Sequence, residues 1–195
     1  FFGILTYAVA QNPSRNQGCQ PPTCQPMTNF KPSDFFLGGW FVTHAKNGSD
    51  SMLCRVYKTK IDGKSKIIVE ADGYYGEGES KYYKVKCTGN QGSGGSGKVS
   101  LTCTKQQPSM PGTSTQAITN FNLELSIIDT DYAQYAIMHR CATYPTLGVT
   151  KDNLLVLHRT RTFIKADIAS IFEKKCRMSL ANFITKPKDT VCKTA

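Results

Sequence analysis

The stretch that decides the fold is Asp34-Phe35-Phe36-Leu37-Gly38-Gly39-Trp40-Phe41-Val42-Thr43-His44. Two glycines interrupt the chain just before Trp40-Phe41-Val42-Thr43, and this pattern predicts a strand that begins at about Trp40. Trp40 is the only tryptophan among the 195 residues, and we expect its large ring inside a hydrophobic core.

Seven further segments have the composition of strands. The clearest is Ile118 to Ile128, where large apolar residues alternate strictly with polar ones. Asp62-Gly63 favours a hairpin turn, and the glycine-rich run 89–97 favours a flexible connector. Eight strands at short spacing predict an all-β antiparallel barrel or sandwich. The predicted strands are 40–43, 53–60, 66–72, 81–88, 98–104, 118–128, 132–141 and 153–159.

The period of the apolar residues changes after the last predicted strand. Ile164, Ile168, Ile171 and Phe172 recur at helical spacing, and Lys174, Lys175 and Arg177 follow, where cations suit the end of a helix. We therefore expect one C-terminal α-helix on the outside of the sheet. Residues 11–35 are rich in Pro, Gln and Asn and predict an extended leader.

The N-terminal residues and the cysteines indicate secretion. Residues 1–10 are apolar and end in Ala-Val-Ala, so we expect them to be the remainder of a signal peptide cleaved before Gln11, with one domain over residues 11–195. Eight cysteines without metal-type spacing indicate disulfides. In a secreted chain Asn47-Gly48-Ser49 is a glycosylation sequon. No later stretch has the length or apolarity of a transmembrane segment.

Composition and motifs argue against an enzyme. The formal net charge is +10, and nothing resembles a nucleophile elbow. Residues 92–98 imitate a phosphate loop, but they lie between two predicted strands and Val99 replaces the required hydroxyl residue. The three histidines fall on separate strands, which favours packing roles over general-base catalysis. We expect no catalytic residue, no metal and no cofactor.

Three stretches together resemble one family. The opening stretch is similar to the lipocalin G-x-W signature in the form found in salivary lipocalins of blood-feeding triatomine bugs, the triabin and nitrophorin group. Asp129 to Cys141, containing Thr130-Asp131-Tyr132-Ala133-Gln134-Tyr135-Ala136, resembles a later strand of that family, and Asp152 to Arg159 resembles the strand after it. The resemblance covers nearly all of the mature chain. It implies an eight-stranded up-and-down lipocalin barrel with one C-terminal helix.

The resemblance also implies a closed barrel end and a disulfide scheme. In lipocalins the signature tryptophan closes one end, and an arginine packs across it; here the partner of Trp40 is Arg159 or Arg161. The family pattern implies the pairs Cys54–Cys192, Cys87–Cys103 and Cys24–Cys141, which leaves Cys19–Cys176. Cys19 and Cys24 lie in the same leader, so the two could exchange partners.

The same resemblance directs attention to one strand of the pocket. It implies that Cys141 faces outward, so alternation turns Arg140, Met138 and Ala136 into the barrel and Tyr135, Ile137 and His139 outward beneath the helix. Glu70 is a possible internal partner for Arg140, which would make the arginine structural. If Arg140 is free, it favours an anionic ligand, with Met138 as an adaptable apolar wall.

The resemblance implies that the function of this protein is to bind a ligand or partner. No histidine lies in the segment 67–75, where haem-carrying relatives have their ligand, so the branches with triabin, pallidipin and amine-binding proteins fit better. We expect a secreted monomer that sequesters a small host mediator (an eicosanoid, a nucleotide or a biogenic amine) and so inhibits platelet aggregation. The alternative is an anticoagulant that meets an anionic surface or a clotting factor through its basic exterior, because residues 159–195 hold nine basic and three acidic residues. Secretion disfavours nucleic acid as a partner.

Overall fold

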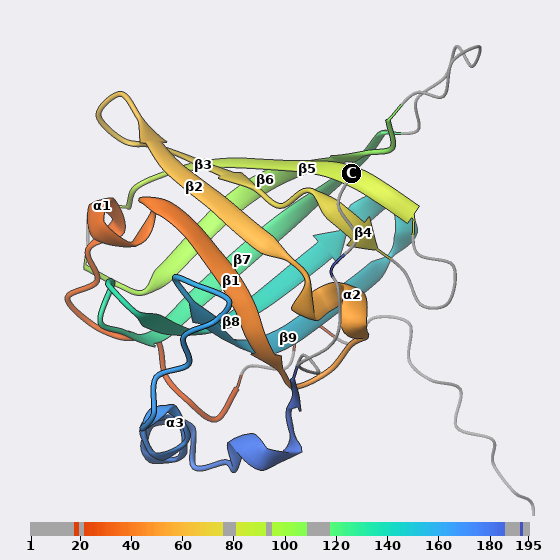
Figure 1. Ribbon diagram of the computed structural model, residues 1–195. Helices are drawn as coiled ribbons and strands as arrows, with labels where there is room; N and C mark the ends of the chain where they lie inside the picture. Colours follow the sequence, from red (N-terminus) through yellow and green to blue (C-terminus); the bar gives the residue numbers. More distant parts are fainter. Residues whose placement is uncertain are drawn as a thin grey trace, which may run out of the picture.

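The protein is a closed antiparallel barrel (Figure 1). The computed structural model describes residues 18–19, 22–75, 81–92, 95–108, 118–185 and 192; the proposed signal-peptide remainder, residues 1–10, lies outside them. Within the described residues eight strands pair in sequence order, and the last pairs with the first, which confirms the predicted barrel. The strands are β1 (Gly38–Ala45), β2 (Val56–Asp62), β3 (Lys66–Glu70), β5 (Lys81–Asn90), β6 (Lys98–Gln106), β7 (Ile118–Thr130), β8 (Tyr135–Tyr144) and β9 (Val149–His158).

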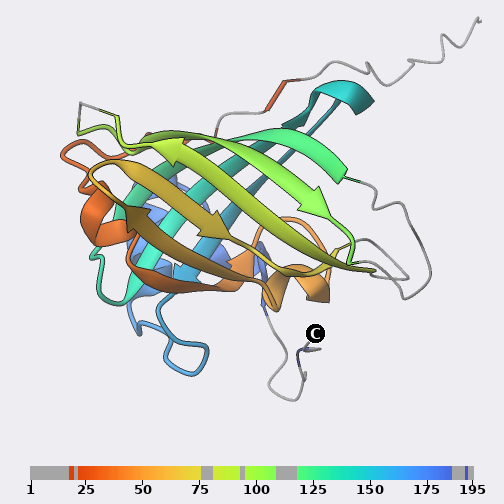
Figure 2. The ribbon, with the colours of Figure 1, turned by 90° about the horizontal axis from the view of Figure 1, so that it is seen from above.

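Short elements decorate this barrel. The helices α1 (Pro32–Phe35) and α2 (Asp50–Leu53) lie at opposite ends of it (Figures 1 and 2). Strand β4 (Gly73–Tyr75) pairs antiparallel with the start of β5, and β10 (Ile184–Thr185) pairs with β1. The predicted C-terminal helix is α3 (Ile168–Cys176), and 3₁₀ turns cover Pro145–Leu147 and Leu180–Asn182.

Two predicted strands have different limits in the structure. Leu53 belongs to α2 rather than to a strand, and β2 begins only at Val56. The segment predicted from residue 132 begins as β8 at Tyr135, because the Asp131 carboxylate accepts hydrogen bonds from the backbone N–H groups of Gln134 and Tyr135 and so stabilises a turn. Local side-chain bonds of this kind compete with the strand ladder.

The predicted alternation divides the side chains between two clusters. On β7, Phe121, Leu123, Leu125 and Ile127 are buried inside the barrel, as the sequence predicts. On β8, Ala136 and Met138 belong to the same interior cluster, whereas Tyr135 and Ile137 pack outside with Ile168 and Phe172 of α3. The sheet is therefore covered on one outer face by the helix.

The helix is shorter than its apolar pattern predicts. Ile164 is 42% exposed and lies four residues before α3, so its predicted place on the buried stripe is wrong. The backbone N–H of Lys165 is instead held by the Nε2 atom of the His158 ring, at 3.2 Å. This bond keeps the segment before the helix in an irregular conformation.

Arg159 closes one end of the barrel beneath α1. Its guanidinium lies 3.6 Å from the centroid of the Trp40 ring, and Trp40 is fully buried. Arg161 instead lies over the Phe41 ring and donates to the carbonyl of Cys54 at 2.7 Å, so Arg159 is the barrel-closure partner. The five guanidinium N–H groups of Arg159 donate to five backbone carbonyls. These carbonyls belong to Asp34, Phe35, Leu37, Gly39 and Tyr132.

The four disulfides agree with two of the implied pairs and correct the other two. Cys54 is bonded to Cys192 and Cys87 to Cys103, as the resemblance implies. The leader cysteines have exchanged partners: the pairs are Cys19–Cys141 and Cys24–Cys176, not Cys24–Cys141 and Cys19–Cys176. The direction of the leader explains the exchange, because the Thr23 hydroxyl donates to the carbonyl of Cys176 and holds Cys24 next to α3.

The leader is tied to the barrel by backbone hydrogen bonds. Met27 donates to the carbonyl of Ile127, and Gly97 donates to the carbonyl of Met27, both at 2.8 Å. A Cβ on Gly97 would lie 2.3 Å from the Ile127 carbonyl oxygen, so only glycine allows this approach. The end of the predicted flexible connector is thus a packed contact.

His158 joins the last strand to the segment that follows it. The Thr43 hydroxyl donates to the carbonyl of Val156, so it accepts the N–H of the His158 Nδ1 atom, 2.8 Å away. The other ring nitrogen accepts from Lys165, as described above. The bond from Lys165 requires the neutral ring, because a protonated Nε2 atom cannot accept, and burial lowers the pKa of His158 to about 4.

We predict that Arg159→Lys lowers the free energy of unfolding by about 3 kcal/mol, because an ammonium cannot reach five carbonyls in a planar fork. Urea denaturation measures this change. Arg177→Lys, at an exposed position after α3, is the matched control and should change stability by less than about 0.5 kcal/mol. Equal effects of the two substitutions would contradict the role given to Arg159.

We also predict that the protein loses stability as the pH falls from about 6.5 to about 4. In this window the unfolded His158 binds a proton and the folded one does not, so protonation favours unfolding, by on the order of 2 kcal/mol. Urea midpoints measured at about pH 7 and about pH 5 test this, and His158→Gln should flatten the dependence. A stability that stays constant across the window would show that the His158 ring is not held neutral.

Candidate functional site

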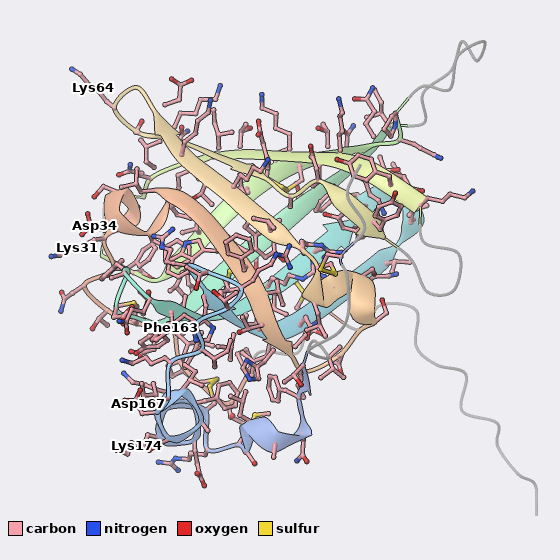
Figure 3. The ribbon with its side chains drawn as sticks, in the orientation of Figure 1. Lys31, Asp34, Lys64, Phe163, Asp167 and Lys174 are labelled. Atoms are coloured by element: carbon pink, nitrogen blue, oxygen red, sulfur yellow. A yellow bond between two sulfur atoms is a disulfide. The ribbon has the colours of Figure 1, made fainter. Side chains whose placement is uncertain are left out.

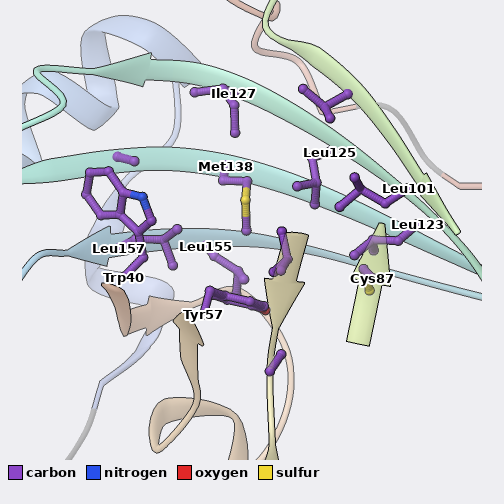
Figure 4. Packing of buried hydrophobic residues seen from close by; sticks show 14 of the residues in the cluster. Trp40, Tyr57, Cys87, Leu101, Leu123, Leu125, Ile127, Met138, Leu155 and Leu157 are labelled. Atoms are coloured by element: carbon purple, nitrogen blue, oxygen red, sulfur yellow. The ribbon is translucent and has the colours of Figure 1, made fainter. Parts of the chain in front are cut away.

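Side chains fill the part of the barrel interior that lies next to Trp40. Trp40 lies toward one end, and Tyr57 and Met138 lie between it and Leu101, Leu123 and Cys87 (Figure 4). A cavity of about 20 Å³ remains between Trp40, Tyr57 and Met138, which is room for about one water molecule. This space is too small for an organic ligand. The opposite end of the barrel carries α2 and β4.

The interior becomes polar and cationic toward that end, which we call the mouth. Arg55 stands beside α2 just before β2 and is only 5% exposed. Arg140, on β8, lies between inward-facing neighbours: Leu125 is opposite it on β7 and Asn153 opposite it on β9. The Nε atoms of both arginines and the hydroxyl of Tyr57 are buried without a hydrogen-bond partner in the described structure.

Aromatic rings surround these cations. The Arg55 guanidinium lies 3.9 Å from the centroid of Tyr75, and the Lys105 ammonium lies 4.6 Å from that ring and 4.0 Å from the ring of Tyr83. On the opposite wall Tyr144 stacks on Phe121, with ring centroids 4.9 Å apart. The mouth thus combines apolar faces with donors, as a site for an amphiphilic ligand requires.

The charged side chains that the structure places around Tyr75, which are those of Arg55, Lys105 and Arg140, are all cationic. Burial and the charges of Arg55 and Lys151 lower the pKa of Lys105 to about 8, and burial raises the pKa of Tyr75 to about 12. Among the side chains that the structure describes, no carboxylate forms an ion pair with Arg55 or Arg140. Buried cations without a counter-charge carry a desolvation cost that a bound anion would offset.

The sequence places three of its four pocket residues correctly and one wrongly. Ala136, Met138 and Arg140 face inward from β8 as predicted, although whether they bind a ligand stays a prediction. Glu70 is exposed on the outer face of β3, between Lys58 on β2 and Lys86 on β5. It cannot pair with Arg140, because its neighbours Ile67 and Val69 take the inward positions of that strand.

Sequence reasoning missed Arg55, Lys105, Tyr57 and Tyr75. The signal for the first three was present in the alternation: Arg55 is two residues before the inward Tyr57, and Lys105 is two residues after the inward Cys103. The signal for Tyr75 was absent, because β4 has only three residues and no alternation to follow.

The predicted sequon lies on the surface near this end. Asn47 is exposed, and its backbone N–H and carbonyl are held by the side-chain amide of Asn153 at 3.1 and 2.6 Å. These bonds leave the Asn47 side chain unengaged by the turn. Glycosylation of Asn47 stays a prediction.

The chain is similar to known proteins in both sequence and fold. The Triabin family model matches residues 10–169. Triafestin-1 of Triatoma infestans is 39% identical over 194 residues, which cover 98% of this chain and 88% of that protein. Pallidipin of Meccus pallidipennis is 29% identical over 189 residues, which cover 95% of this chain and 91% of that protein. Among solved structures, the tryptamine complex of the amine-binding protein of Rhodnius prolixus has a TM-score of 0.65 and 21% identity over 87% of this chain and 86% of that chain. The complex of a protein named LTBP1 with leukotriene C4 has a TM-score of 0.52 and 24% identity, and the match covers 82% of this chain and 89% of that chain.

The unpaired guanidinium in the mouth has a measurable consequence for the free protein. We predict that Arg140→Met raises the free energy of unfolding by up to about 1 kcal/mol, because a flexible apolar side chain replaces a half-buried cation whose Nε atom has no hydrogen-bond partner. Thermal denaturation of the unliganded protein measures the change. A large loss of stability would instead mean that Arg140 is structural, as the sequence alternative with an internal acid supposes.

Proposed function

The chain belongs to the triabin family, and from this premise we propose that it is a secreted binding protein that sequesters a small anionic mediator of the host in the mouth of its barrel. The observation that carries the proposal is the pair of arginines Arg55, which is buried, and Arg140, which is half-buried, whose buried Nε atoms have no hydrogen-bond partner among the described residues. Removing a mediator of platelet activation would inhibit platelet aggregation, and one relative is named a platelet inhibitor, triplatin-2.

The charge of the mouth favours an anion over an amine. A cationic amine would need a carboxylate or a similar acceptor, and it would meet Arg55, Arg140 and Lys105 instead. A carboxylate or phosphate can accept charge-assisted hydrogen bonds from both guanidinium groups. The ligand class we favour is therefore an amphiphilic carboxylate of the eicosanoid type, followed by a nucleotide phosphate.

The apolar part of such a ligand also has a place. Met138 and the ring of Tyr57 form the floor above the small cavity, and Tyr75, Tyr83 and Tyr144 form the walls. Aromatic faces and a flexible thioether accommodate an acyl chain without fixed geometry. The arginines would hold the head of the ligand and this wall its tail.

Secretion rests on independent features. Four disulfides join the leader, the barrel and the C-terminal segment, as is typical of oxidising compartments. None of the helices in the described ranges has the length and apolarity to cross a membrane. A glycan on Asn47 would be compatible with ligand entry if it points away from the barrel axis.

The second candidate function acts through the basic exterior. Lys174 and Arg177 are exposed on and after α3, where an anionic surface or a clotting factor could meet them. Other cations of this region are already neutralised locally: Lys175 pairs with Asp129 at 2.9 Å and Lys165 with Asp167 at 3.6 Å. The described part of this surface is therefore weaker support than the mouth.

Calorimetry against arachidonate, ADP and tryptamine tests the proposal. We expect one-to-one binding of an anion, a weakening of roughly tenfold or more with Arg140→Met, and little change with Arg177→Met on the exterior. Heat with tryptamine alone would overturn the anionic assignment. Delayed clotting without heat from any of the three ligands, lost in Arg177→Met, would support the exterior instead.

A further inference from the structure

We propose that the mouth of the barrel docks on an anionic phospholipid membrane and takes its ligand from there. The choice of a membrane-borne amphiphile rests on the proposed function. The docking itself rests on separate features of the mouth, which are an apolar rim, a belt of tyrosines and a set of exposed lysines.

The apolar rim comes from three strand ends. Among the described residues six large hydrophobic side chains are exposed, and half of them lie here: Ile118 is 58% exposed, Leu147 64% and Val149 39%. Leu147 occupies the turn between β8 and β9, and Val149 pairs with Tyr144 directly beside it. Ile118 begins the neighbouring strand β7. Side chains of this kind are costly to leave in water unless a partner or a bilayer covers them.

The tyrosine belt lies on β4 and β5. Tyr74 and Tyr82 meet edge to face on the outer side at 5.4 Å, and Tyr75 and Tyr83 meet in the same way on the inner side at 6.0 Å. Tyrosine is enriched where a protein crosses from the headgroup region into hydrocarbon, because its ring is apolar and its hydroxyl is polar. The inner pair belongs to the ligand-binding wall, so the belt connects the rim to the pocket.

The lysines give the mouth its preference for an anionic surface. Lys46, at the end of β1, Lys81, at the start of β5, and Lys151, near the start of β9, are all exposed. Among the residues that the structure describes, two carboxylates near this end are engaged locally: Asp72 accepts from the backbone N–H of Val85, and Asp152 lies 3.5 Å from the ring of His139. Exposed lysines beside apolar side chains are the combination that binds bilayers containing anionic lipid.

Docking in this orientation would serve the pocket directly. A lipid acid in a bilayer has its carboxylate at the headgroup level, and the first charges it would meet on entering the mouth are Lys105 and Lys151. Arg55 and Arg140 lie deeper in the same interior. The ligand would pass from lipid to protein with its tail against the tyrosines, without crossing bulk water.

Vesicle flotation with the full chain tests the docking. We expect the protein to float with vesicles of phosphatidylcholine containing one third phosphatidylserine, and much less with phosphatidylcholine alone. Ile118→Ser/Leu147→Ser should weaken binding roughly tenfold. The matched control is Leu37→Ser/Phe163→Ser, which removes two exposed apolar side chains away from the mouth and should bind as the wild type does (Figure 3).

A second pair of variants tests the charge. Lys46→Gln/Lys151→Gln should weaken binding to the phosphatidylserine vesicles by roughly tenfold, whereas Lys60→Gln/Lys64→Gln, at the β2–β3 hairpin, should not. Absence of flotation by the wild type, or equal losses for mouth and control pairs, would overturn the docking. If vesicles bind but arachidonate gives no heat in solution, the proposed function fails and the docking stands. If arachidonate binds but vesicles do not, the docking fails alone.

Discussion

The interaction on which the rest of the structure depends is the contact of the Arg159 guanidinium with Trp40 and five backbone carbonyls. It joins β9 to α1, to the start of β1 and to the turn before β8. Arg159 is half-buried, and its desolvated donors are satisfied only when these segments meet in this arrangement. Closing one end in this way fixes the barrel and leaves the other end to carry function.

Arginines at the two ends of the barrel differ in whether their N–H donors have acceptors. Arg159 has an acceptor for each of its N–H groups, whereas Arg55 and Arg140 each keep a buried Nε without one. Because the barrel provides an acceptor for every N–H group of Arg159, the fold itself does not require that acceptors be missing at Arg55 and Arg140. In the function we propose, the acceptor for these donors arrives with the ligand, and the aromatic lining around them receives its apolar part.

Much of this arrangement follows from the sequence, because period-two alternation and the glycine-bounded tryptophan act locally. Alternation puts Phe121, Leu123, Leu125 and Ile127 on one apolar face, and together with the family resemblance it turns Met138 inward. It does not determine which face of a short strand is the inner one, and that is why Glu70 was expected inside although Ile67 and Val69 occupy those positions. The partners of Cys19 and Cys24 depend on the path of the leader, which is set by long-range contacts such as that of Met27 with Ile127. Arg55 was missed although a local signal was present, because its spacing of two residues from the inward Tyr57 points it to the same face.

The central claim is that the mouth binds a negative charge, and the most direct measurement compares arachidonate with its methyl ester by calorimetry. The two molecules share the same chain and differ only in the ionised carboxylate, so apolar burial cancels in the comparison. We predict that the acid binds at least roughly tenfold more tightly than the ester and that the difference disappears in Arg55→Met/Arg140→Met. Equal binding of acid and ester by the wild type would contradict the account, because it would show that Arg55 and Arg140 do not recognise the ligand.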